Sequence, residues 1–400
     1  RYPGLRPAMR PQISTRETLT TLAGLADSPF EDARAMPPEI YTSDDILALE
    51  KEQIFATDWV CAGLANEIPS HGDYITFSIA DQPVFVPRDG NGDIRSFANV
   101  CRHRMMELLE GRGNKKRIVC PYHAWTYNLD GQLIGAQHME HSNAFKKKEI
   151  CLPEVRTEIW EGWIYLSLNP DALPLAKTLA PLGKIVARYR MADYIPVVNE
   201  DHVWQTNWKL LTENFMEGYH LPVAHKATVG AWFPAEETKF PKNAPKGFTY
   251  QSFVKDEIAT YGQAHPKNKR LKGKWRNTSL LPTVFPSHMY VLAPDHLWYL
   301  SLRPDGVGQT KVRFGVALAP EVHDSLEDVD AFVREMVDFF VKVNAEDRYV
   351  VEGIFRGARA PYTQPGPLSW LERELHDFMK YLASRLPAGS GSATLRQAAE

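Results

Sequence analysis

The sequence predicts an α+β protein, in which a small antiparallel β domain precedes a larger domain of antiparallel strands and helices. Short β-rich runs separated by turn signals extend from residue 45 to about residue 170. After that point, strand pairs alternate with segments of helical periodicity until about residue 387. The length of 400 residues also exceeds what one hydrophobic core usually organises. We therefore expect two domains.

Four segments follow from these patterns. Residues 1–44 are rich in Pro and Arg with little periodicity, and are expected to form an arm that depends on other surfaces for order. The β domain covers residues 45–170, with "DGNGD" as a hairpin signal and Asn169-Pro170 closing its last strand. The larger domain covers residues 171–387, and the Gly/Ser-rich residues 388–400 are expected to be a flexible tail.

Two helices of the larger domain can be located from the sequence. Apolar residues recur at helical spacing between residues 329 and 340, which indicates a core-facing helix. Ser369 is a predicted N-cap, and Glu372 three residues later completes a capping box. A second helix is therefore expected to begin there.

The composition disfavours several partners. A net charge of −3 gives no general attraction for nucleic acid or anionic lipid. No apolar run approaches the roughly 18 residues of a membrane span. Four cysteines in 400 residues do not form a disulfide framework. We expect a cytoplasmic globular protein that binds neither nucleic acid nor membrane.

The stretch "CRHRMMELLEGRGNKKRIVCPYHAWTY" contains two Cys-His pairs. Cys101 and His103 form the first pair, and Cys120 and His123 form the second. Two thiolates and two imidazoles can hold a structural zinc, or a [2Fe-2S] cluster with Cys on one iron and His on the other. Zinc sites commonly pair like with like, whereas here each loop can give one ligand to each iron. The spacing favours the cluster.

These residues resemble a known motif. "CRHR" and "CPYHAWTYNLDG", with sixteen residues between His103 and Cys120, are similar to the Rieske motif, and the β-rich surroundings fit a Rieske domain. Two neutral histidine ligands raise the reduction potential above that of four-cysteine clusters. One departure is visible: Rieske oxygenases usually have Gly after "CRHR", and this chain has Met105.

A second metal-like constellation lies in "NWKLLTENFMEGYHLPVAH". Its first part, "NWKLLTENFMEGYH", is helical in pattern, so Glu213, Glu217 and His220 are expected on one stripe at i, i+4 and i+7. His225 can fold back towards His220 from beyond the helix end. Two histidines and one carboxylate on one side of an iron form a facial triad that leaves positions open for O₂ and substrate.

The third ligand must come from elsewhere in the chain. "VNAEDRYVVEGIFRG", after the helix at 329–340, offers Glu346, Asp347 and Glu352. This segment resembles the late "ED" motif of Rieske non-haem iron oxygenase α subunits, and the resemblance implies that Asp347 is the iron ligand. The usual Gln before "RG" is Phe355 here.

Together the two motifs resemble a Rieske non-haem iron oxygenase α subunit over roughly residues 45–385. The resemblance implies a helix-grip catalytic domain with mononuclear Fe(II), O₂ as co-substrate, and a homotrimer that places one subunit's cluster beside its neighbour's iron. It implies that Glu217 links the two centres across that interface. We consider Asn207 and Asn214 as residues that orient the ligands. No GxGxxG unit is visible, so NAD(P)H electrons are expected through a separate flavin- or ferredoxin-type reductase.

The substrate is predicted less sharply. Ring-hydroxylating members mostly have Asp at the linking position, whereas relatives that oxidise quaternary ammonium compounds have Glu. Glu217 therefore favours hydroxylation or oxidative demethylation of a small quaternary ammonium substrate. A mono- or dioxygenase acting on a small aromatic acid is the alternative, and a Rieske electron-transfer protein is the alternative of another class. Candidates for cation-π contacts with the substrate are the aromatic residues Trp232, Phe233, Tyr290, Trp298 and Tyr299.

Overall fold

The computed structural model describes residues 9–233, 235–241, 247–255 and 261–389. The chain forms two compact units, described separately below. One unit covers Phe55–Thr178, and the other combines the described residues up to Ile54 with those from Leu179 onward. Both contain antiparallel sheets, as the sequence predicts. From residue 390 onward, the predicted flexible tail lies outside the described residues.

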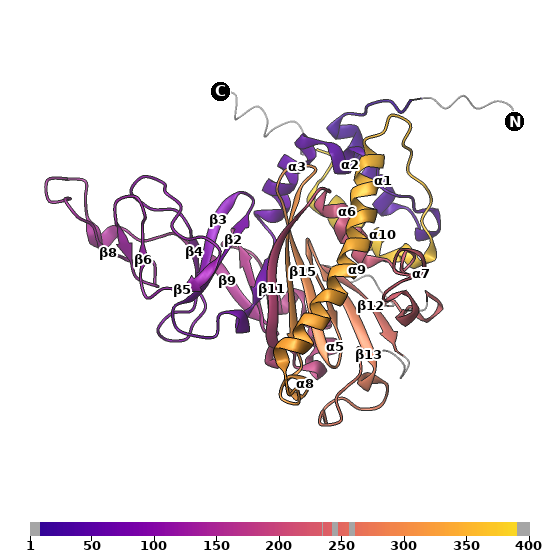
Figure 1. Ribbon diagram of the computed structural model, residues 1–400. Coiled ribbons are helices and arrows are strands. Elements are labelled where there is room, and N and C mark those ends of the chain that lie inside the picture. Colours follow the sequence, from indigo (N-terminus) through magenta and orange to yellow (C-terminus); the bar gives the residue numbers. More distant parts are fainter. Residues whose placement is uncertain (1–8, 234, 242–246, 256–260, 390–400) are drawn as a thin grey trace, which may run out of the picture. The chain divides into compact units, whose positions relative to one another are not determined.

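The smaller unit contains one seven-stranded and one three-stranded antiparallel sheet (Figure 1). The strand order is β1-β10-β9-β4-β3-β2-β5 in the first sheet and β6-β7-β8 in the second. Both sheets contribute to one core, in which Tyr74, Phe85 and Tyr127 are buried with the two cysteines Cys101 and Cys120. The strands are β1 (Val60–Leu64), β2 (Asp73–Ile79), β3 (Gln82–Pro87), β4 (Ser96–Ala98), β5 (Arg112–Asn114), β6 (Ile118–Val119), β7 (Thr126–Tyr127), β8 (Leu133–Gly135), β9 (Glu154–Trp160) and β10 (Trp163–Ser167).

The larger unit is built on a six-stranded antiparallel sheet with the order β11-β16-β15-β14-β13-β12. Its strands are β11 (Ile195–Trp204), β12 (Phe248–Val254), β13 (Thr278–Val284), β14 (His288–Leu292), β15 (His296–Pro304) and β16 (Thr310–Leu318). The helices are α1 (Thr15–Asp27), α2 (Glu39–Thr42), α3 (Asp44–Glu50), α5 (Ala180–Val186), α6 (Trp208–Met216), α7 (Leu221–Ala224), α8 (Pro320–His323), α9 (Val329–Ala358) and α10 (Arg373–Arg385), while α4 (Leu175–Thr178) belongs to the smaller unit.

Helix α9 crosses the sheet of the larger unit (Figure 1). Its residues Met336 and Phe340 are buried together with Leu300 of β15 and Phe314 of β16. The sequence predicts this helix only to residue 340, but α9 continues without a break to Ala358. The polar residues after 340 hide this continuation, because only Val343, Val351, Phe355 and Ala358 of the later turns are buried.

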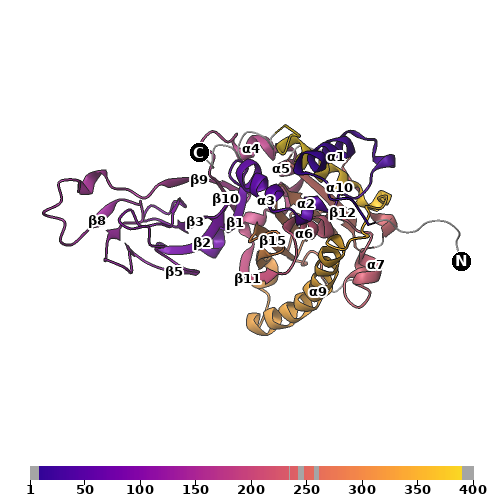
Figure 2. The ribbon, with the colours of Figure 1, turned by 90° about the horizontal axis from the view of Figure 1, so that it is seen from above.

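The N-terminal segment is more regular than the sequence suggests. Helix α1 begins with a capping box formed by Ser14 and Glu17 and buries Leu19 and Leu22. It lies beside α10 in both views (Figures 1 and 2). Helix α3 supplies Glu50, which forms a buried ion pair with Lys209 of α6 at 2.6 Å. These contacts explain why residues up to 54 belong to the larger unit.

The predicted capping box near the C-terminus is confirmed. Ser369 accepts a hydrogen bond from the backbone of the following turn, and the Glu372 side chain accepts from the Ser369 N–H. The box closes one short turn, Trp370–Glu372, before α10 begins. Among the described residues, no helix combines the length and the apolar character needed to cross a bilayer.

Candidate metal centres and substrate pocket

The first cysteine-histidine loop is held by its own backbone. The Cys101 N–H donates to the carbonyl of Met106 at 2.8 Å, and the Met105 N–H donates to the carbonyl of Cys101 at 3.1 Å. Met105 adopts the left-handed conformation with φ 58° that glycine adopts without strain. Met105 thus preserves this turn, at a cost on the order of 1 kcal/mol.

The second loop repeats this geometry. The Cys120 N–H donates to the carbonyl of Trp125 at 2.8 Å, and the Ala124 N–H donates to the carbonyl of Cys120 at 3.0 Å. Ala124 has φ 54°, close to the value at the matching position of the first loop. Two similar turns therefore present the two Cys-His pairs.

The four predicted cluster residues meet between these loops. The cysteines are buried, at 2% exposure for Cys101 and 3% for Cys120. The rings of His103 and His123 are exposed, and their centroids lie 4.7 Å apart. Trp125 stacks on His103 at 4.8 Å. Burial raises the pKa of the Cys101 thiol, so a bound metal would have to supply the positive charge that stabilises its thiolate.

A tyrosine not predicted from the sequence contacts the cysteine sulfur. The Tyr127 hydroxyl lies 3.3 Å from Cys101 Sγ and accepts a hydrogen bond from the Arg102 N–H at 3.1 Å. Because the hydroxyl accepts from Arg102, its own hydrogen is available to the sulfur. Hydrogen bonds to the sulfurs are one way in which proteins set the potential of an iron-sulfur cluster.

The expected helical stripe at the second constellation is wrong. Helix α6 ends at Met216, and Glu217 is extended with φ −118° and ψ 142°. Its carboxylate accepts from the backbone N–H of Tyr219 and of His220, and such local side-chain bonds compete with a helix. Glu213 does not face the histidines but accepts a hydrogen bond from the Tyr41 hydroxyl at 2.9 Å.

The two histidines flank the short helix α7. The His225 N–H donates to the carbonyl of Leu221 at 3.2 Å, and the Gly230 N–H donates to the carbonyl of His225 at 2.9 Å. A Cβ on Gly230 would lie 2.6 Å from the Leu221 carbonyl oxygen, so only glycine fits this turn. The centroids of the two histidine rings lie 5.1 Å apart, so both imidazoles can reach one metal ion.

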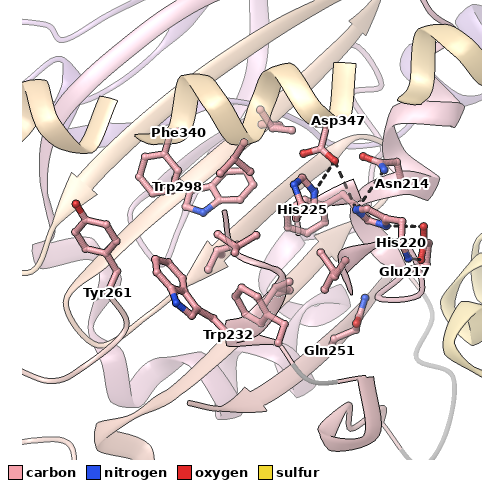
Figure 3. A pocket seen from close by; sticks show the side chains of 18 of the residues that line it. Asn214, Glu217, His220, His225, Trp232, Gln251, Tyr261, Trp298, Phe340 and Asp347 are labelled. Atoms are coloured by element: carbon pink, nitrogen blue, oxygen red, sulfur yellow. Dashed lines mark hydrogen bonds and ion pairs between the residues drawn. The ribbon is translucent and has the colours of Figure 1, made fainter. Parts of the chain in front are cut away.

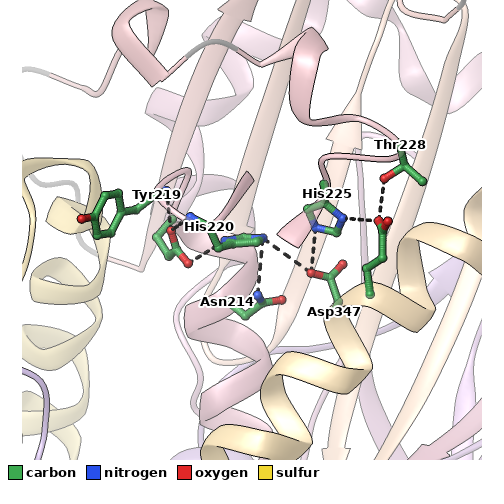
Figure 4. A network of polar contacts seen from close by, with 8 residues as sticks. Asn214, Tyr219, His220, His225, Thr228 and Asp347 are labelled. Atoms are coloured by element: carbon green, nitrogen blue, oxygen red, sulfur yellow. Dashed lines mark hydrogen bonds and ion pairs between the residues drawn. The ribbon is translucent and has the colours of Figure 1, made fainter. Parts of the chain in front are cut away.

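Asp347 completes the site from α9. Its Oδ1 lies 3.0 Å from His225 Nε2 and 3.5 Å from His220 Nε2 (Figure 4). One ligand atom from each of the three residues lies within 4.8 Å of the other two. The structure thus brings together the three residues assigned to iron from the sequence.

Carboxylates also hold the other nitrogen of each histidine ring. Glu217 Oε1 lies 2.6 Å from His220 Nδ1, and Glu346 Oε2 lies 2.7 Å from His225 Nδ1. Thr228 donates its hydroxyl hydrogen to the same oxygen of Glu346 at 2.6 Å. Such pairs fix the tautomer and leave the Nε2 lone pair for a metal.

The charges of this site suit a divalent cation. Burial alone would lower the pKa of His220, but hydrogen bonds to Asp347 and Glu217 raise it to about 10. Without a metal, the carboxylates thus hold a proton on the imidazole as counter-charge. A divalent ion can replace that proton, and two imidazoles with one carboxylate are the donor set of facial iron sites. The residues present therefore fit iron.

The two predicted asparagines serve different purposes. Asn214 lines the pocket beside the triad, with Nδ2 3.5 Å from His220 Nε2. Asn207 caps α6: its side chain accepts from the Lys209 N–H at 3.1 Å and donates to the carbonyl of Val307 at 2.8 Å. Its hydrogen bonds thus stabilise the start of the helix that carries Asn214. Of the other acids, Glu352 accepts from the Gln205 N–H at 3.0 Å instead of contacting a histidine.

A pocket opens beside the triad (Figure 3). Its walls are mainly apolar, and the aromatic side chains among them are Phe215, Trp232, Phe233, Tyr261, Trp298, Phe339 and Phe340. Trp232, Phe233 and Trp298 are expected from the sequence, whereas Tyr290 and Tyr299 are fully buried outside this lining.

Sequence reasoning missed Tyr261, Phe339 and Phe340, together with the polar lining residues Gln251, Lys255 and His296. A helical period continued backward from Asp347 gives Val343, Phe340 and Phe339, all of which line the pocket. That signal was present in the sequence. Tyr261 and Lys255 carry no such periodic signal.

Two family models match this chain. A family described as ring hydroxylating alpha subunit (catalytic domain) matches residues 188–388, and the Rieske [2Fe-2S] domain matches residues 58–150. The chain is 28% identical over 403 residues to the glycine betaine monooxygenase oxygenase subunit of Chromohalobacter salexigens, covering 91% of this chain and 89% of that protein.

Two solved structures show the same fold. One is a quaternary ammonium Rieske monooxygenase in complex with L-carnitine, at a TM-score of 0.76 and 21% identity, covering 94% of this chain and 99% of that one. The other is naphthalene 1,2-dioxygenase from Rhodococcus, at a TM-score of 0.78 and 23% identity, covering 94% and 98%. The catalytic family spans half of the chain and the Rieske family precedes it. The chain therefore belongs to the Rieske non-haem iron oxygenase α subunits, enzymes that combine a [2Fe-2S] cluster with a mononuclear iron.

Proposed function

We propose that this chain is a terminal oxygenase component that hydroxylates or oxidatively demethylates a quaternary ammonium compound. The main support is an apolar, aromatic-lined pocket that opens on the triad of His220, His225 and Asp347. When bound at this triad, Fe(II) would supply O₂ activation. We further propose that the electrons originate from NAD(P)H and arrive through a separate flavin- or ferredoxin-type reductase.

The proposed cluster ligands are Cys101, His103, Cys120 and His123. The matched turns that hold the loops and the exposed histidine rings support this assignment. Exposed imidazoles also suit electron transfer to another protein surface. We propose a homotrimer in which Glu217 links His220 to a cluster histidine of a neighbouring subunit. Its carboxylate already binds His220 Nδ1, which is one half of that link.

The aromatic lining supports a cationic substrate. Aromatic faces attract quaternary ammonium groups, and this attraction is strongest where water is excluded. Trp298 and Phe340 lie between the triad and the Tyr261 end of the pocket in Figure 3, with their ring centroids 5.8 Å apart. A relative acts, by its name, on glycine betaine, and a solved structure of the same fold binds L-carnitine. Both ligands carry a trimethylammonium group.

The reaction consumes one O₂, two electrons and two protons for each hydroxylation, and releases one water. The chain's own residues would hold the substrate methyl group or neighbouring carbon at the triad and keep bulk water out of the apolar pocket. Asn214 would contribute an amide beside His220. Hydroxylation of an N-methyl group gives an N-hydroxymethyl product that releases formaldehyde.

The test is a substrate screen with the purified chain, its metals and an added reductase. We expect O₂ uptake with stoichiometric organic product from glycine betaine, carnitine or a related trimethylammonium compound. Product analysis is needed because O₂ can be consumed without substrate oxidation. Product from a small aromatic acid and from no ammonium compound would overturn the proposed substrate class.

A further inference from the structure

Lys255 is a buried cation in the wall of the substrate pocket, directly after β12. The residue is 3% exposed, and it lines the same cavity as the His220, His225 and Asp347 triad. An ammonium group removed from water needs a counter-charge or hydrogen-bond acceptors. Its contacts therefore indicate what the pocket is built to receive.

Among the described residues, the contacts of Lys255 leave its charge largely uncompensated. Its Nζ lies 4.6 Å from the ring centroid of Phe233 and 5.5 Å from that of Trp232. Its only hydrogen bond to a described residue is a long one, 3.4 Å, to the carbonyl of Tyr261. Among the described residues, no carboxylate oxygen lies within 4 Å of this nitrogen.

The described acid that attracts Lys255 is already engaged. Asp295 attracts Lys255 electrostatically, but one carboxylate oxygen binds His296 Nδ1 at 2.8 Å and the other accepts from the Gly262 N–H at 2.7 Å. Burial lowers the pKa of Lys255 to about 8, so the side chain is still mostly protonated at neutral pH. Among the described residues, the Lys255 ammonium thus faces the pocket without a carboxylate at ion-pair distance.

We propose that Lys255 binds a carboxylate of the substrate. This inference rests on the proposed function, and for a quaternary ammonium substrate it selects a betaine over a choline-like alcohol. Lys255 contacts Tyr261, which lies at the opposite end of the pocket from Asp347 in Figure 3. The carboxylate would occupy the Tyr261 end, and the ammonium group would lie towards the triad. Without a carboxylate, a buried lysine would repel the cation that the aromatic walls attract.

The experiment measures binding without turnover, by calorimetry on the metal-loaded chain in the absence of O₂ and reductase. The probes are γ-butyrobetaine, its methyl ester and choline, and the variants are Lys255→Met and Lys255→Arg. We expect Lys255→Met to weaken γ-butyrobetaine binding by about 10- to 100-fold, as for loss of a hydrogen bond to a charged group. The ester and choline should change by less than about threefold, and Lys255→Arg should retain most of the affinity for the acid.

Lys274→Met is the matched control, because its ammonium also lies over a tryptophan, 5.6 Å from the Trp275 ring, but outside the pocket lining. Equal losses for acid, ester and choline in Lys255→Met would assign Lys255 to packing and overturn the proposal. If Lys255→Met does not fold, the wild-type chain decides: it must bind γ-butyrobetaine at least about tenfold more tightly than the ester.

Benzoate separates this inference from the proposed function. If benzoate binds in a Lys255-dependent way and no trimethylammonium compound binds, the substrate class of the proposed function fails while the role of Lys255 stands. If γ-butyrobetaine and its ester bind equally to wild type and to Lys255→Met, the role of Lys255 fails while the substrate class stands.

Discussion

The cysteine-histidine loops and the two-histidine, one-carboxylate site are supported in different ways. Backbone hydrogen bonds within two short turns hold Cys101 and Cys120. Side chains hold the iron site, where Glu217 binds one histidine ring and Glu346 of α9 binds the other. The first arrangement depends on local chain geometry, and the second depends in part on packing between segments more than 100 residues apart.

This difference decides which substitutions should matter at each centre. Around the cluster, a side chain can change as long as the turn persists, and Met105 in a left-handed position is an example. Around the iron, removal of one supporting carboxylate should release a ring that no backbone bond fixes. The two centres should therefore respond separately to mutation.

The largest expected effect is at Asp347. Asp347→Ala removes the only α9 side chain that contacts both histidine Nε2 atoms. We expect mononuclear iron affinity to fall by more than the roughly 100-fold seen at most for outer partners of metal ligands, and product formation to fall with it. Iron analysis and the visible spectrum check this, because the [2Fe-2S] absorbance should remain.

The control for Asp347 is Glu352→Ala on the same helix. Glu352 binds the Gln205 N–H and Arg348 and does not line the pocket. Its removal should leave iron content unchanged. Equal iron loss in both variants would show that helix damage, and not a lost ligand, explains the result.

The sequence likewise predicts the residues of the cysteine-histidine loops more directly than those of the iron site. Cys101, His103, Cys120 and His123 lie within one stretch of 23 residues, so their spacing alone indicates a shared centre. Asp347 lies 122 residues after His225, and only a family resemblance selected it over Glu346. Neighbouring residues on a helix point about 100° apart, yet Glu346 and Asp347 both contact the His225 ring. Glu346 lies at Nδ1 and Asp347 at Nε2.

The sequence predicts least well the elements that are stabilised by contacts with residues far away in the chain. The arm before residue 45 contains α1, whose apolar residues are buried by α10 more than 300 residues later in the chain. The stripe of Glu213, Glu217 and His220 failed because carboxylate-to-backbone bonds end α6 early. Neither Lys255 nor Tyr261 follows a period, since Lys255 directly follows β12 and Tyr261 lies outside the helices and strands.

Glu217 distinguishes iron binding from coupling between the centres. Glu217→Gln keeps an oxygen that can accept from His220 Nδ1, so iron should remain bound at saturating Fe(II). Turnover should fall by about 100-fold if the carboxylate links the centres. Single-turnover oxidation of the reduced cluster should slow in parallel.

The matched control is Glu213→Gln, four residues earlier. Burial raises the pKa of Glu213 to about 8, so this carboxyl is already mostly protonated at neutral pH and Gln replaces it closely. Its turnover should stay within about twofold of wild type. Normal turnover in Glu217→Gln would contradict the coupling role.

Glu346 should affect affinity instead of coupling. Glu346→Ala frees His225 Nδ1 and leaves the Thr228 hydroxyl without its acceptor. We expect Fe(II) affinity to fall by roughly 10- to 100-fold, with near-normal turnover once iron is saturating. Glu346→Gln should restore most of the affinity. A turnover defect at saturating iron would assign Glu346 to a role beyond positioning.

Gly230 tests whether the turn that carries His225 tolerates any side chain. Gly230→Ala places a Cβ 2.6 Å from one carbonyl oxygen and 2.8 Å from another, which should cost roughly 1–3 kcal/mol of stability. Gly357→Ala, in α9 with open space around it, should instead be neutral or stabilising by up to about 1 kcal/mol. Thermal denaturation of the larger unit compares the two.

The smallest expected effect is at the cluster. There, the substitution of one side chain tests whether the cysteine-histidine loops depend on their backbone alone. Tyr127→Phe removes the hydroxyl beside Cys101 Sγ without changing the turns. A hydrogen bond to a thiolate stabilises the more negative, reduced cluster, so its loss should lower the potential. A difference on the order of 1 kcal/mol between the oxidation states corresponds to about 40 mV for one electron. Spectroelectrochemical titration measures this shift, and metal content should stay full. Loss of the cluster in Tyr127→Phe would instead show that this centre also depends on side-chain support, and the contrast between the two sites would fail there.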